Sequence, residues 1–163
     1  MKIILLVLLA FFFSGFYHLP RTKKFAGRYS YGKDPENGRA GFIDIYPETD
    51  SSILFYLDLN RGAPSYNMGQ LYGRAKLIGN SGVFFMKNGK NNCRFRLTFS
   101  RGVVVLKTVD DSFDCPFGGG VFVDGNYKQF SKKAPKYFIG PTGEDTIYFR
   151  KHLPKSIMNK AKN

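Results

Sequence analysis

In the stretch Cys93-Arg94-Phe95-Arg96-Leu97-Thr98-Phe99, apolar side chains and a cysteine occupy every second position. The positions between them hold two arginines and a threonine. Neighbouring side chains of a β-strand point to opposite faces of the sheet. This period of two therefore predicts a strand with one face in a core and the other in water.

The same alternation recurs along the chain and predicts an all-β fold. Further strands are expected over residues 25–31, 41–46, 53–59, 71–77, 82–87, 103–106, 120–123, 136–139 and 146–150. Asn-Gly, Asp-Gly and other glycine-containing turns separate them and favour tight hairpins. We predict a single antiparallel meander of about eight or nine strands. Closure into a barrel would remove exposed sheet edges, and a β-sandwich is the alternative.

Length and composition exclude several other classes of protein. With 163 residues, one domain is expected. Phe and Tyr are too frequent for a disordered chain, and Gly and Pro are too frequent for a coiled coil without heptads. A single long apolar run excludes a multi-pass membrane protein built of helices.

The chain begins with a pattern typical of a secretory signal. Met1-Lys2 precedes eleven apolar residues, 3–13, and the small residues Ser14 and Gly15 follow. We predict a signal peptide over residues 1–20, a barrel domain over 21–150, and a basic tail over 151–163 that forms a short helix or frayed end. The protein is expected to be exported, either periplasmic or secreted. An uncleaved signal that anchors it in the membrane is the alternative.

Two cysteines, Cys93 and Cys115, are predicted to form one disulfide in an exported chain. Two separate buried thiols are the alternative. A hairpin turning at Arg101-Gly102 would place Cys93 opposite Asp110, so the bridge requires the loop before Cys115 to fold back over the hairpin end. No histidine lies close to either cysteine in the sequence, and we predict no metal site.

Residues for nucleophilic catalysis are sparse. Histidine occurs at His18, in the predicted signal, and at His152, in the predicted tail, and no G-x-S-x-G is present. A serine or cysteine nucleophile needs a base beside it. We therefore predict a protein that is not an enzyme and uses no cofactor. A secreted enzyme or toxin that uses carboxylates is a remaining alternative.

Charge is the strongest functional signal, because the formal net charge is +13. Such a surface attracts anionic partners. The predicted contact residues come from two basic clusters, and they are Lys128, Lys132, Lys133, Lys136, Arg150 and Lys151. The expected partner is an anionic envelope polymer, a lipid headgroup or an acidic protein. Nucleic acid is not expected for an exported protein, and the N-terminal segment could add membrane contact.

Several motifs resemble those of small exported bacterial β-barrel proteins. The first is Phe25-Ala26-Gly27-Arg28-Tyr29, which is similar to the aromatic-x-Gly start of lipocalin-like barrels. The others are residues 69–75, 93–99, 115–118 and 123–127. The resemblance extends to lysozyme-inhibitor-like proteins and implies a barrel without specifying a ligand. Such inhibitors bind a basic enzyme, which implies an acidic face on the inhibitor. This chain, in contrast, is basic.

These observations predict an exported, non-enzymatic binding protein that recognises an anionic envelope component or a protein partner through a basic surface. One alternative is a carrier that holds a small apolar ligand inside the barrel. The other is a lysozyme-inhibitor-like or secreted effector protein.

Overall fold

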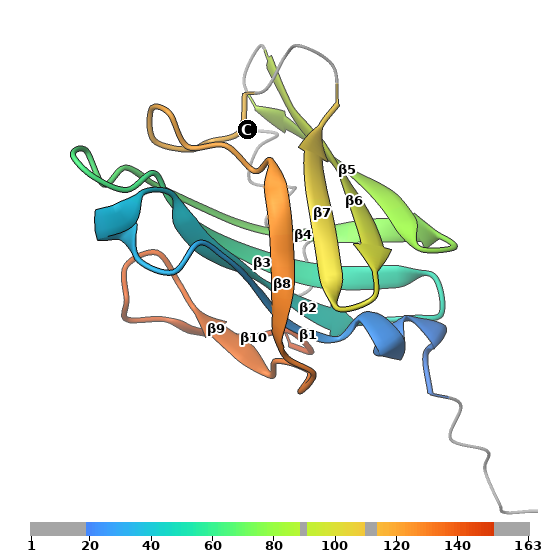
Figure 1. Ribbon diagram of the computed structural model, residues 1–163. Coiled ribbons are helices and arrows are strands. Elements are labelled where there is room, and N and C mark those ends of the chain that lie inside the picture. Colours follow the sequence, from blue (N-terminus) through green and yellow to red (C-terminus); the bar gives the residue numbers. More distant parts are fainter. Residues whose placement is uncertain (1–18, 89–90, 110–113, 152–163) are drawn as a thin grey trace, which may run out of the picture.

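Eight antiparallel strands form a closed barrel in the computed structural model of the protein (Figure 1). The structure describes residues 19–88, 91–109 and 114–151. The barrel strands are β1 (Gly27–Tyr31), β2 (Ala40–Pro47), β3 (Ser52–Asn60), β4 (Met68–Ile78), β5 (Ser81–Asn88), β6 (Asn91–Ser100), β7 (Val103–Thr108) and β8 (Gly125–Ser131). Each strand pairs with the next along the chain, and β8 pairs with β1. The predicted all-β meander and its closure are confirmed.

Two short 3-10 helices and a separate hairpin accompany the barrel in the residues that the structure describes. Helix η2 (Arg21–Phe25) precedes β1, and η3 (Pro35–Asn37) lies between β1 and β2. Strands β9 (Tyr137–Ile139) and β10 (Thr146–Tyr148) form a two-stranded sheet of their own. Figure 1 shows this hairpin beside β1, β2 and β3, outside the barrel. The predicted strands 136–139 and 146–150 therefore exist but do not belong to the barrel.

The predicted strand at 120–123 is wrong. Residues 121–124 have no regular secondary structure, and the last barrel strand is β8, which begins at Gly125. Val121 and Val123 are apolar because their side chains pack into the core from this connection. The first strand is predicted over 25–31, but β1 begins at Gly27, because Phe25 ends η2 and stacks on Phe99 with ring centroids 4.3 Å apart.

The hairpin between β6 and β7 has the expected register. Phe95 pairs with Thr108 and Ser100 with Val103, so the turn is at Arg101-Gly102 as predicted. Cys93 is bonded to Cys115, and the amide of Asp114 donates to the Asn92 carbonyl at 3.3 Å. The connection after β7 thus folds back over the hairpin end. Asp110 itself lies outside the described residues.

Side chains fill the interior of the barrel. Phe55 of β3 contacts the rings of Phe84 and Phe95 edge-on, with centroids 5.1 and 5.8 Å away. A methyl group at Gly73 of β4 would lie 2.5 Å from Phe84 Cε2 and 2.7 Å from Phe55 Cζ. The backbone of β4 therefore approaches these rings as closely as glycine allows, which is how small barrels fill their centre.

A second apolar cluster holds the C-terminal hairpin on the outer face of β3 and β4. Phe138 of β9 stacks on Tyr56 with ring centroids 4.1 Å apart. Phe149, which follows β10, stacks on Tyr46 and meets Tyr72 edge-on. Both phenylalanines are buried. This cluster explains why β3 and β4 have the aromatic residues Tyr56 and Tyr72 at outward positions.

Candidate anion-binding groove

A groove of about 410 Å³ lies between the outer face of the barrel and the segment that leaves β8 for β9. Ser131 ends β8 opposite Arg28 of β1, and its Oγ accepts a hydrogen bond from the Lys133 amide at 3.2 Å. The chain then crosses the barrel surface until Phe138 anchors β9. The groove is therefore fixed at both ends, by the β8–β1 ladder and by the aromatic cluster.

An ion pair forms the wall of the groove on the barrel side. The Arg28 guanidinium donates to both carboxylate oxygens of Asp44, at 2.8 and 2.7 Å. The Asp44 side chain is 2% exposed, whereas that of Arg28 is 43% exposed. The hydrogen bond to Asp44 raises the pKa of Arg28. Arg28 also lies over the Phe42 ring, 3.9 Å from its centroid. The negative charge of Asp44 is thus balanced by Arg28. The ion pair holds Arg28 in place, and the exposed part of its side chain lines the groove.

Two lysines and two aromatic rings complete the lining of the same groove. Lys133 and Lys136 are exposed, and so are Phe130 (80%) and Tyr137 (49%). Asp44 is the one acid among the lining residues, and Arg28 balances it. The groove therefore presents positive charge beside flat apolar surface, a combination that suits an anionic chain with apolar groups in its backbone.

A smaller groove of about 280 Å³ continues along β1 and shares Arg28 and Phe130 with the first. Its other lining residues include Tyr31 and Lys33. Together the two grooves give an elongated path on the outside of β1, β2 and β8, so an extended ligand fits this surface better than a compact one.

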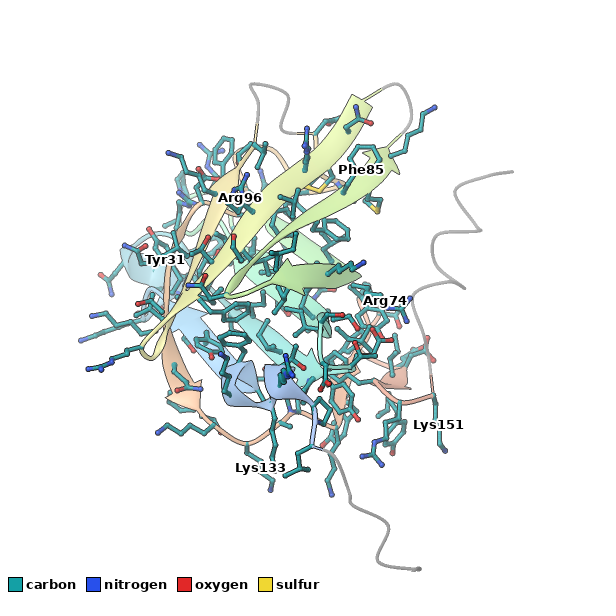
Figure 2. All side chains as sticks on the ribbon, turned by 90° about the vertical axis from the view of Figure 1, so that its right-hand side faces the viewer. Tyr31, Arg74, Phe85, Arg96, Lys133 and Lys151 are labelled. Atoms are coloured by element: carbon teal, nitrogen blue, oxygen red, sulfur yellow. A yellow bond between two sulfur atoms is a disulfide. The ribbon has the colours of Figure 1, made fainter. Side chains whose placement is uncertain are left out.

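The structure separates the six predicted contact residues. Lys133 and Lys136 line the groove, Lys132 is exposed immediately after β8, and Lys128 lies beside Ser30 on the outer face of the barrel. Arg150 and Lys151 lie elsewhere, because Arg150 Nε donates to the Tyr46 hydroxyl at 2.6 Å and Lys151 Nζ is 5.3 Å from the centroid of the Tyr148 ring. Figure 2 shows Lys133 and Lys151 on different parts of the surface.

Sequence reasoning did not group Arg28 or Lys33 with these lysines. More than a hundred residues separate Arg28 from Lys133, and the pairing of β1 with β8 brings them together. No local spacing carries that signal. Phe130 and Tyr137 were recognisable as aromatic residues between lysines, and the structure places both at the groove.

A partly buried polar network lies between the barrel and the C-terminal hairpin. Gln70 Nε2 donates to Asp58 Oδ2 at 3.0 Å, and the Tyr56 hydroxyl lies 3.3 Å from the same oxygen and from the Ile139 carbonyl. Burial raises the pKa of Asp58, although hydrogen bonds from Gln70 and Tyr56 act in the opposite direction. The network links β3 and β4 to β9 and positions the hairpin that carries Tyr137.

Two further findings bear on where the protein acts. The Cys93–Cys115 disulfide is consistent with an exported protein. Within residues 19–88, 91–109 and 114–151, no helix has the length and apolar character needed to cross a bilayer. The chain was also compared with family models, with curated proteins and with solved structures, and it matches none of them.

Proposed function

We propose that the protein is an exported, non-enzymatic binding protein that holds an anionic polymer of the cell envelope in the groove beside β1. The observation that supports this most strongly is the arrangement of Arg28, Lys133 and Lys136 around one elongated groove with exposed Phe130 and Tyr137. The signal-like N-terminus and the disulfide support export.

The chemistry of these side chains suits repeated phosphate or carboxylate groups. Lysine ammonium groups are mobile point charges that follow an irregular anionic chain, whereas Arg28 is fixed by Asp44 and offers an oriented donor. The rings of Phe130 and Tyr137 offer apolar contact to the carbon backbone between the charges. Binding of this kind weakens as salt rises, because the cations release counterions from the polymer.

The test uses a phosphodiester polymer, poly(glycerol phosphate), with affinity measured at several salt concentrations. Replacing Lys133 and Lys136 with glutamine should weaken binding by about tenfold. It should also lower the slope of log affinity against log salt by about 1.4, which is the value for two lost phosphate contacts. Equal affinity and slope for wild type and variant would remove the groove from the interface.

The charge-matched control replaces Arg150 and Lys151 with glutamine. These residues lie outside the groove, so the expected loss is much smaller. A larger loss in this control would move the contact to the C-terminal cluster. Vesicles of anionic lipid and a soluble acidic protein, tested with the same variants, distinguish a polymer from the other two partner classes.

The alternative of a carrier for an apolar ligand requires space inside the barrel. The inward residues Phe55, Phe84 and Phe95 are in mutual contact there, and the ring edges reach the backbone of Gly73. We therefore place binding on the outer surface. In the part of the chain that the structure describes, no feature favours the inhibitor-like or effector alternative over a polymer-binding role.

A further inference from the structure

The outer face of strands β5 to β8 is basic and lacks acidic residues. The five cations on these strands are Lys87, Arg94, Arg96, Lys107 and Lys128, and all of them are exposed. The four strands contain no Asp or Glu in their sequences. The acids within barrel strands, Asp44 and Asp58, lie on β2 and β3. Figure 2, in which Arg96 and Phe85 are labelled, looks towards this part of the barrel.

Two of these cations lie directly opposite each other. Arg96 of β6 pairs with Lys107 of β7, and the next positions in the same row are Val83 of β5 and Lys76 of β4. Neither Arg96 nor Lys107 is in a salt bridge with a carboxylate of the described residues. Like charges that face each other across a ladder destabilise a sheet. The pair therefore lowers the stability of the free protein, and a bound anion would relieve it.

The basic face continues to the groove. Lys107 is four residues along β7 from Val103, which pairs with Lys128, and Lys128 in turn pairs with Ser30. Three residues further along β8, Ser131 lines the groove. From strand geometry the path from Lys107 to Ser131 is about 25 Å long. This path is long enough for several phosphate groups of an extended phosphodiester chain.

We propose that Arg96, Lys107 and Lys128 extend the groove into one continuous track for a linear polyanion that wraps part of the barrel. This inference rests on the proposed function. The ligand class is a long, flexible chain of repeated phosphate groups. A short chain occupies the groove alone. A long chain also covers the Arg96–Lys107 pair, so affinity rises with chain length.

The experiment compares poly(glycerol phosphate) of 3 and 20 units with wild type, the Lys133→Gln/Lys136→Gln variant and an Arg96→Thr/Lys107→Thr variant. Threonine is a good strand residue, so the second variant should fold and have a midpoint of thermal unfolding equal to or above that of wild type. It should lose about tenfold in affinity for the long chain and less than twofold for the short one. The groove variant should lose affinity for both.

The control Arg150→Gln/Lys151→Gln removes the same charge from residues outside the groove and the track, and should change long-chain affinity by less than twofold. If Arg96→Thr/Lys107→Thr binds the long chain as wild type does, or loses no more than the control, the track is wrong and the groove stands. If the groove variant binds both chains normally, the proposed function fails as well. Tighter binding of a 20-residue single-stranded oligothymidylate than of the 20-unit polymer would overturn the assignment to an envelope polymer and favour nucleic acid.

Discussion

At the scale of single residues, the carboxyl group of Asp58 links the stability of the protein to pH. Burial raises its pKa above the ordinary value of 3.8, so the folded state keeps a proton that the unfolded state releases. The free energy of unfolding should therefore fall as pH rises from about 4 through the raised pKa of the folded protein. Asp58→Asn removes this titration and keeps an oxygen that can accept from Gln70.

The measurement is urea unfolding of wild type and Asp58→Asn across this pH range, with the exposed Glu144→Gln as a charge-matched control. The wild type should become less stable relative to Asp58→Asn as pH rises, and the control should show no such trend. A wild type that gains stability relative to the variant with rising pH would mean that the folded state lowers this pKa.

At the scale of elements, the β9–β10 hairpin sets the outer wall of the groove. Phe149 is fully buried against Tyr46 and Tyr72, so Phe149→Ala should cost about 3 kcal/mol of unfolding free energy. The variant should also bind poly(glycerol phosphate) more weakly, because Lys136 and Tyr137 are no longer held at the groove. Chemical unfolding and binding titrations measure both effects.

The matched control is Thr146→Ala, on an exposed position of β10, which should change stability by less than about 0.5 kcal/mol. Equal stability of the two variants would show that the aromatic cluster does not hold the hairpin.

The sequence predicts the strands well where apolar and polar residues alternate strongly. It does not predict contacts that depend on closure of the barrel. Strand β6 and its hairpin with β7 follow from the apolar positions around Phe95 and the turn at Arg101-Gly102. Strand β8 escapes prediction because its inward positions hold Gln129 as well as Tyr127, and Gln129 donates to the Ala26 carbonyl and the Tyr29 hydroxyl rather than joining the apolar core.

The candidate site is predictable in part for the same reason. Lys133 and Lys136 are near each other in the sequence, and their grouping needs no tertiary information. Arg28 joins them through the pairing of the first and last barrel strands. The outer position of the C-terminal hairpin depends on Tyr56 and Tyr72, whose outward direction is visible once the register of β3 and β4 is known.

At the scale of the whole molecule, the barrel has a filled apolar interior and a cationic exterior. The interior contains the mutually packed rings of Phe55, Phe84 and Phe95, whereas β5 to β8 hold five exposed cations and no acid on the exterior. Under the proposed function, the closed barrel supports the groove, and the ligand binds to its outer surface.

Nuclear magnetic resonance tests this division of roles most directly, by titrating the isotope-labelled protein with 20-unit poly(glycerol phosphate). The largest chemical-shift changes should occur at outward residues along the groove and track, such as Phe130, Tyr137 and Arg96, while the inward residues Phe55 and Leu97 stay unchanged. Shifts concentrated at Phe55 and Leu97, with none at the three outward residues, would contradict binding on the exterior.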